Sequence, residues 1–159
     1  MDWYISYFYQ IRFMNKTMIP VSTATWDPKW FHQFNGNNFV FRDKNDVING
    51  LRCVPLNPSK IYDAEHDCES KSCDKMVDGN WCNFLTKYYD YLNTLDFNGL
   101  LQMMETHCKK LQPDCESICL MVHETFENPC SERAPLIRWF NDHGIELKPF
   151  MYVKELWYM

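Results

Sequence analysis

The sequence is poor in basic residues and has no long apolar run. Its 159 residues include 16 Lys and Arg, of which only five are Arg, against 21 Asp and Glu, and the formal net charge is -5. Proteins that bind nucleic acid nonspecifically are normally basic, so the overall charge argues against that class and leaves room only for a local basic patch. No run of about 18 apolar residues is present to predict a membrane span. The first residues also lack the basic leader and apolar core of a signal peptide.

Several common chemical motifs are missing as well. There is no Gly-x-Gly-x-x-Gly fingerprint, no phosphate loop, and no pair of carboxylates at the helical spacing of metal sites. Aromatic residues, in contrast, make up 16% of the chain and include six Trp. This much apolar surface excludes disorder, and the length suits one domain over residues 1–159. Without an export signal we expect the domain in the cytoplasm, where its eight cysteines are reduced.

The stretch from residue 116 to 144 predicts the fold class. Ser117–Val122 is continuously apolar, which is typical of a strand that is covered on both faces in a parallel sheet. Ser131 can cap a helix that has Pro135 in its first turn and apolar residues at helical spacing. Gly144 is suited to end that helix in a left-handed conformation. Strand, loop and helix together predict an α/β fold: a small Rossmann-like three-layer domain with a mostly parallel sheet.

Other apolar segments predict the remaining elements. We expect strands over residues 3–8, 18–22, 51–56 and 145–150, helices over 83–94 and 97–111, and a short helical crossover over 10–15. Pro20 is unfavourable inside a sheet, so the second strand should begin at or after it, and Pro149 should lie at an edge. Residues 26–31 are expected to form a loop or short helix, 35–38 a hairpin turn, and 43–49 a helical turn.

Reactive side chains gather in the loop after the central strand. In open α/β sheets, ligands bind beyond the carboxyl ends of the strands. Cys130 comes just before a helix N-terminus, which favours a thiolate, and His123 or Glu124 could act as its base. Arg133 and Ser131 are candidates for holding an anionic group of a ligand. The alternative is that Cys130 is a buried thiol that packs under the loop.

A second set of candidate ligand-binding residues follows the first two strands. Ser6 and Tyr7 end the first strand, and Ser22 and Thr23 end the second, so their hydroxyls meet at one edge of a parallel sheet. Trp26 follows and could stack a base, because an aromatic face accepts any base. The alternative is that the hydroxyls serve turns and caps and that the Trp is part of the core.

Residues 62–82 form an irregular, cysteine-rich insertion. It contains His66, Cys68, Cys73 and Cys82, a set that could close a tetrahedral zinc site. The spacing lacks the Cys-x2-Cys knuckle of zinc fingers, so thiols in an exposed loop, or a disulfide, are the alternatives. Residues 151–159 are very apolar for a tail and are expected to dock on the domain itself, on a second copy in a homodimer, or on a partner.

Two parts of the chain are similar to a known family. The N-terminal part has I-S-Y-F, I-P-V-S and W-D-P-K-W-F, and the later part has P-C-S-E-R and W-F-N-D-H-G. With these motifs the chain resembles the phage-type branch of the domain-of-unknown-function 488 family. The resemblance implies a small Rossmann-like α/β domain of phage type, acting in the host cytoplasm, and it carries over Cys130 and Arg133. Where that family more often has His after the Cys, this chain has Ser131-Glu132.

Three functional hypotheses follow. The first is an enzyme or binding protein for a nucleotide, nucleobase or other phosphorylated ligand at the loop after the central strand. The second is a non-enzymatic counter-defence protein that sequesters a signalling nucleotide or binds a host defence protein. The third is an interaction module stabilised by zinc through residues 66–82. None of them requires a membrane.

Overall fold

A parallel sheet forms the centre of the molecule. The computed structural model describes residues 1–33, 48–64 and 81–151. Within these ranges the strand order is β3-β4-β2-β5-β1-β6, and every pairing is parallel. The strands are β1 (Asp2–Tyr7), β2 (Met18–Ser22), β3 (Phe31–Gln33), β4 (Ile48–Arg52), β5 (Ser117–Val122) and β6 (Lys148–Pro149). The predicted Rossmann-like α/β fold is confirmed, and Pro149 lies on an edge strand as expected.

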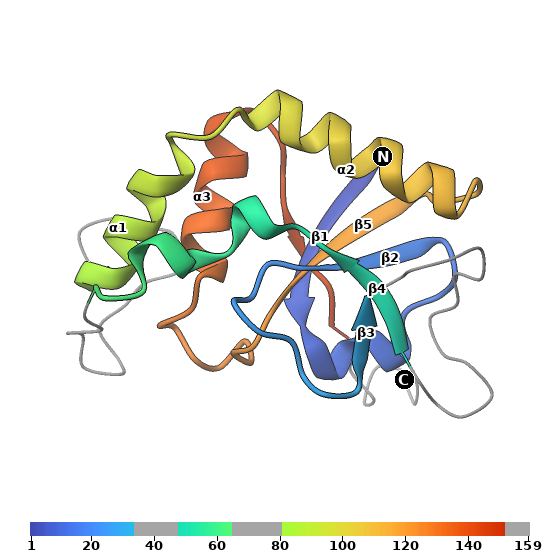
Figure 1. The fold of residues 1–159 in the computed structure, drawn as a ribbon, viewed down its shortest axis with the longest axis horizontal. Coiled ribbons are helices and arrows are strands. Elements are labelled where there is room, and N and C mark those ends of the chain that lie inside the picture. Colours follow the sequence, from blue (N-terminus) through green and yellow to red (C-terminus); the bar gives the residue numbers. More distant parts are fainter. Residues whose placement is uncertain (34–47, 65–80, 152–159) are drawn as a thin grey trace, which may run out of the picture.

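Helices follow the positions that the apolar periodicity predicts. They are α1 (Asn83–Leu92), α2 (Phe97–Leu111) and α3 (Arg133–Asp142), with short 3-10 helices η1 (Phe8–Phe13), η2 (Val54–Leu56) and η3 (Pro58–Ile61). Asp96 caps α2 by accepting a hydrogen bond from the Gly99 amide at 3.1 Å. Gly144 has φ +79° after α3, the left-handed conformation that glycine adopts at least cost. Figure 1 shows α2 crossing above the strands and α1 beside α3. No described helix is long and apolar enough to cross a bilayer.

Strand register assigns α3 and α2 to one face of the sheet. Residues paired in parallel register point to the same side, so Trp3 of β1 shares its face with its partner Ile118 of β5. The Trp3 ring lies 5.5 Å from the ring of Phe140 in α3. Phe97 of α2 lies 5.1 Å from the same Phe140 ring. Both helices therefore cover the face to which Trp3 points.

The 3-10 helix η1 covers the opposite face. Leu51 is in register with Val21, Leu120 and Ile5, which share the face of Trp3, so the neighbouring Gly50 faces the other side of the sheet. A Cβ on Gly50 would lie 2.6 Å from the Phe31 ring, and this ring lies 5.4 Å from the ring of Phe8, the first residue of η1. The sheet is thus the middle of three layers.

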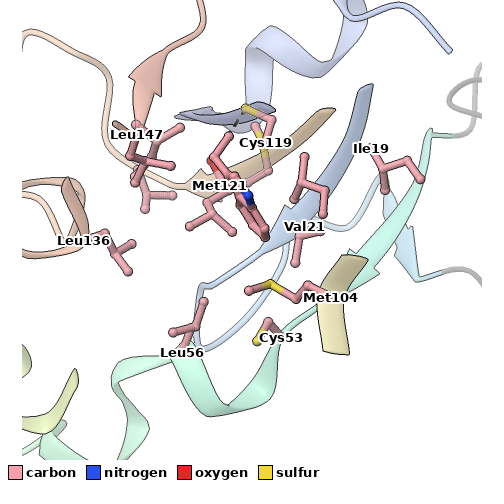
Figure 2. Close-up of a cluster of buried hydrophobic side chains, with 14 of the residues drawn as sticks. Ile19, Val21, Cys53, Leu56, Met104, Cys119, Met121, Leu136 and Leu147 are labelled. Carbon is pink, nitrogen blue, oxygen red and sulfur yellow. Dashed lines mark hydrogen bonds between the residues drawn. The ribbon is translucent and has the colours of Figure 1, made fainter. Parts of the chain in front are cut away.

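β5 is buried along its whole length, as is its neighbour β2. All six of its residues are buried, as its uninterrupted apolar sequence predicts for a strand covered on both faces. Figure 2 shows Met104 of α2 and Cys53 gathered beside Val21 of β2, next to the side chains of β5. This core holds the carboxyl ends of β2 and β5, and the loops that follow them, in fixed positions.

Pro20 lies in the middle of β2, whereas the sequence predicted a strand that begins at or after it. β2 pairs with β5 along its whole length, but its pairing with β4 covers only Val21 and Ser22. The carbonyl oxygen of Pro20 would lie 2.8 Å from a Cβ on Gly50, so the proline directs its polar groups toward β4. The missing N–H of Pro20 therefore falls where β4 makes no registered pair with β2. No hydrogen bond of the sheet is lost there, and this loss is the usual cost of a proline inside a strand.

Other boundaries differ from the prediction. The strand predicted over 51–56 ends at Arg52, because Val54–Leu56 form a 3-10 turn in which the Leu56 amide donates to the Cys53 carbonyl at 3.1 Å. The loop or short helix predicted over 26–31 ends in the three-residue strand β3. The predicted turn over 35–38, most of the helical turn over 43–49, most of the insertion over 62–82 and the tail over 152–159 lie outside the described residues.

Candidate functional site

A cleft of about 460 Å³ opens at the carboxyl ends of β2 and β5. This is the edge of a parallel sheet at which ligands are expected to bind. Its described lining comes from the loop after β2, from η3 and the residue that follows it, from α1, and from the end of β5 and the loop after it. The lining residues are Thr23, Ala24, Thr25, Trp26, Pro58, Tyr62, Phe84, Val122, His123, Glu124 and Glu132.

Arg133 fixes the loop on one side of the cleft. Its guanidinium donates to the carbonyls of Glu124 at 3.0 Å, Thr125 at 3.1 Å and Asn128 at 2.9 Å. It also lies 4.8 Å from the centre of the Phe126 ring, and only 2% of the residue is exposed. The sequence predicted that Arg133 would grip a ligand anion; the structure instead uses its donors to satisfy loop carbonyls, and it does not line the cleft.

Arg52 has the same role on the other side of the cleft. Its guanidinium donates to the carbonyl of Ala24 at 3.0 Å and to that of Thr25. An ion pair of 3.9 Å joins it to Asp27, which in turn accepts a hydrogen bond from the Ser22 hydroxyl. Each of the two loops that face the cleft is therefore held by an arginine that donates to its backbone carbonyls.

The cleft contains a pair of acidic residues, Glu124 and Glu132. Burial, the charge of Glu124 and a hydrogen bond with Glu124 raise the pKa of Glu132 to about 8. At neutral pH this carboxyl is therefore largely protonated and can donate a hydrogen bond. Oε1 of Glu124 is buried and accepts no hydrogen bond from any described residue, which is a costly state for a carboxylate oxygen. The pair thus shares one proton, and Glu124 keeps an unsatisfied acceptor.

Aromatic groups surround the mouth of the cleft. The Trp26 and Tyr62 rings lie 6.4 Å apart, and the two residues are 59% and 61% exposed. His123 lies between Trp26 and the core: its Nε2 lies 2.7 Å from the Trp26 carbonyl oxygen, and its ring lies 4.9 Å from the ring of Phe8. Exposed aromatic faces beside a cleft are suited to stack a planar ligand.

The predicted ligand-binding hydroxyls are mostly bonded within the protein. The hydroxyl of Ser6 donates to the Phe150 carbonyl at 2.5 Å, and that of Tyr7 accepts from Gln10 at 2.9 Å. The Ser22 hydroxyl donates to Asp27. These three residues do not line the cleft, so the alternative of structural hydroxyls describes them better. Thr23 does line it, although its hydroxyl donates to the Met121 carbonyl at 3.0 Å.

Cys130 is not brought together with its predicted bases. His123 and Glu124 line the cleft, but Cys130 packs in a separate small cluster with Trp81, Cys82 and Phe84. Its sulfur lies 3.8 Å from that of Cys82, the residue before α1. Cys130 therefore does not line the cleft in which His123 and Glu124 lie. Ser131 accepts a hydrogen bond from the Arg133 amide at 3.2 Å, but the N-cap of α3 is Glu132, whose side chain makes no capping bond, so the predicted cap lies one residue before the observed one.

The predicted zinc ligands can be placed only in part. His66, Cys68 and Cys73 lie outside the described residues, and Cys82 is buried beside Cys130. Among the described residues no three His, Cys, Asp or Glu side chains gather as a metal site.

Sequence reasoning missed several cleft residues. Glu132, Tyr62 and Phe84 are not among the predicted site residues, whereas Thr25 lies at the carboxyl end of β2, where the sequence predicts ligand-binding hydroxyls. No sequence signal brings Tyr62 or Phe84 to the end of β5, because their placement depends on how η3 packs against α1 and how α1 packs against α3. Glu132 lies eight residues after Glu124. Of these residues, it alone could have been predicted near Glu124, if the loop between them folds back.

Comparison with known proteins finds no similar protein. No family model matches this chain, and neither a curated protein nor a solved structure matches it. The resemblance to the domain-of-unknown-function 488 family therefore stays a prediction.

Proposed function

We propose that this protein binds a nucleobase, free or within a nucleotide, in the cleft between the loops after β2 and β5. The observation that carries the proposal is the Glu124–Glu132 pair in the lining of the cleft, with Oε1 of Glu124 unsatisfied, beside exposed aromatic rings. A cleft of about 460 Å³ is within the range of small-molecule sites.

The carboxyl pair favours binding along a particular edge of the base. When a base replaces the hydrogen bond within the pair, the protonated carboxyl donates through O–H and accepts through C=O, so it matches a ring nitrogen acceptor beside an amino group. Adenine and cytosine present this combination, and flipped bases are commonly read along this edge. Uracil and hypoxanthine present a ring N–H beside a carbonyl, which a protonated carboxyl alone also matches, but they have no amino group at this edge whose second hydrogen can donate to Oε1 of Glu124. The proposed preference is therefore for the amino-substituted bases.

The aromatic side chains favour contact with the flat face of the base. Trp26 and Tyr62 lie at the mouth with large exposed areas and meet edge to face, so a flat ligand can stack upon the exposed face of either ring. Stacking of one base on an aromatic side chain contributes about 1–3 kcal/mol. Base binding therefore has an apolar contribution that does not depend on the carboxyls.

The composition of the cleft argues against phosphate as the main anchor. Its described lining includes two Glu and no Lys or Arg, and the neighbouring Arg52 and Arg133 donate to backbone carbonyls. A phosphate held near Glu124 would meet like charge without a compensating cation. Of the expected ligand classes, the base is supported better than the phosphate.

Binding is supported better than glycosidic hydrolysis. Carboxyls that cleave glycosides lie about 5–9.5 Å apart, because nucleophile, water and sugar stand between them. Glu124 and Glu132 share a hydrogen bond, which favours joint recognition of one ligand edge. Incubation with nucleosides and chromatography of the products tests turnover separately.

The test is a thermal-shift titration with adenine, cytosine, uracil, hypoxanthine and their nucleosides at pH 7. A ligand that binds only the folded chain raises the unfolding temperature by mass action. We expect shifts with adenine or cytosine compounds, and at least about tenfold weaker binding for Glu132→Gln and Trp26→Ala, which corresponds to about 1.4 kcal/mol.

Two variants serve as matched controls. Glu127→Gln removes an exposed carboxylate of the same loop that does not line the cleft, and Tyr9→Ala removes an exposed aromatic ring outside it. Both should bind like the unaltered chain. If no base shifts the unfolding temperature, or if the shift is unchanged in Glu132→Gln and Trp26→Ala, the proposed function is wrong.

A further inference from the structure

We propose that Cys82 and Cys130 are a modification site at which a peroxide forms a reversible disulfide. The two sulfurs lie 3.8 Å apart, in contact, although the residues are 48 positions apart in the sequence. Cys82 directly precedes α1, and Cys130 lies in the loop that leads to α3. The inference does not depend on the nucleobase proposal.

The two thiols differ in access, which sets the order of the reaction. Cys82 is 4% exposed, whereas Cys130 is half-buried in its loop. Peroxide therefore reaches Cys130 first: its thiolate attacks the O–O bond, gives a sulfenic acid and releases hydroxide. The Cys82 thiolate then attacks the Cys130 sulfur and displaces the second hydroxide. In sum two thiols and one peroxide give one disulfide and two water molecules.

Closing the bond requires only local movement. A disulfide has sulfurs about 2.05 Å apart, so the pair must approach by roughly 1.8 Å, which side-chain rotation and a small loop shift can supply. Cys130 belongs to a loop outside the sheet, so this shift does not disturb the paired strands.

Other described thiols are less suited to this reaction. Cys108 and Cys115 hydrogen-bond to each other, but both are buried, at 0% and 6% exposure. Cys53 and Cys119 are buried too, and burial raises the pKa of each thiol. None of the six described cysteines forms a disulfide in the structure.

The bond would join two walls of the cleft. Phe84 lies two residues after Cys82, Glu132 lies two residues after Cys130, and both side chains line the cleft. Phe84 also packs in the same small cluster as the two cysteines. Oxidation therefore links α1 to the entry of α3 directly behind these lining residues.

The test treats the unaltered, purified chain with hydrogen peroxide in slight excess. Digestion without reductant and mass spectrometry should show a peptide that links Cys82 to Cys130, with two of the eight thiols lost and recovered by dithiothreitol. The unfolding temperature of the oxidised chain should rise, because the link restricts the unfolded state.

Variants and metal analysis distinguish a Cys82–Cys130 disulfide from other disulfides and from a zinc site. Cys130→Ser and Cys82→Ser should each abolish the rise in unfolding temperature, while Cys53→Ala should keep it. A Cys82–Cys130 peptide in the unaltered chain supports the inference even if a variant fails to fold. Linkage of either cysteine to Cys68 or Cys73 would overturn it. So would about one zinc per chain that is lost with Cys130→Ser, since sulfurs about 3.8 Å apart also fit a tetrahedral zinc site.

Discussion

Glu132 is the residue with the most unusual protonation. Its folded pKa of about 8 lies above the ordinary value of 4.5, so between these two pH values the folded chain keeps a proton that the unfolded chain has lost. The carboxyl therefore favours folding fully below pH 4.5, and this contribution is lost as the pH rises through about 8.

Replacing Glu132 by Gln should remove this pH dependence. The amide stays neutral and can still donate a hydrogen bond to Glu124. We expect Glu132→Gln to gain free energy of unfolding relative to the unaltered chain between about pH 5 and pH 9, as measured by urea unfolding at several pH values. Glu127→Gln should show a constant difference over this range. A constant difference for Glu132→Gln would show that its carboxyl is ionised in the folded chain.

Arg133 should contribute to the free energy of unfolding. A buried guanidinium that donates three hydrogen bonds to carbonyls leaves all three unsatisfied when it is removed. We expect Arg133→Met to lower the free energy of unfolding by about 3 kcal/mol, and Arg133→Lys to recover only part of this, since an ammonium cannot reproduce the fork of donors.

The matched control for Arg133 is Arg138→Met. Arg138 makes a 3.0 Å ion pair with Asp142 one helical turn away, with about a third of each side chain exposed. Such pairs contribute about 0.3–0.5 kcal/mol, so urea unfolding should show a small loss. Equal losses for both variants would contradict the loop-holding role of Arg133.

Among the elements, β4 depends on a glycine at its close approach to β2 and β3. A Cβ at Gly50 would lie 2.6 Å from the Phe31 ring and 2.8 Å from the Pro20 carbonyl oxygen. Gly50→Ala should therefore lower the free energy of unfolding by about 1–3 kcal/mol, because the ring and the strand must move apart.

A double variant tests the cause of this loss. Phe31→Leu shortens the side chain that meets the added methyl group, so the double variant Gly50→Ala, Phe31→Leu should lose less than the sum of the single losses. Additive losses in urea unfolding would show that the ring is not the obstacle.

The same elements show what the sequence could predict. α1, α2 and β5 were predictable because each carries its own periodicity: a stripe at helical spacing, or an unbroken apolar run. β3 was not, since three residues are too few for a pattern. The interior position of Pro20 depends on where β4 begins to pair, which is a property of the neighbouring strand.

For the whole molecule, topology was more predictable than the site. A buried strand, a polar loop and a helix predict a parallel sheet and the edge at which a cleft lies, and His123, Glu124, Thr23 and Trp26 do line it. The direction of side chains was not predictable. Arg133 was expected to face a ligand, yet the loop after β5 folds over it, and Glu132 faces the cleft in its place.

The whole-molecule prediction concerns pH and ligand binding together. If a protonated Glu132 donates to the bound base, binding should weaken as the pH rises above about 8 and this carboxyl loses its proton. Titrating the best-binding base by calorimetry from pH 6.5 to about 9.5 checks this. Glu132→Gln should bind with weaker but pH-independent affinity. Affinity that is flat with pH in the unaltered chain would exclude a proton from Glu132 in recognition.

The two arginines that hold the loops have a consequence for how this chain can change over generations. Arg52 and Arg133 reach the loop carbonyls from outside the cleft, so Thr25 and Glu124 keep their backbone positions whatever side chains they carry. Substitutions at lining positions can therefore alter ligand preference at little cost to folding. The cleft is open to diversification, and a descendant of this chain could acquire a different ligand while keeping the same scaffold.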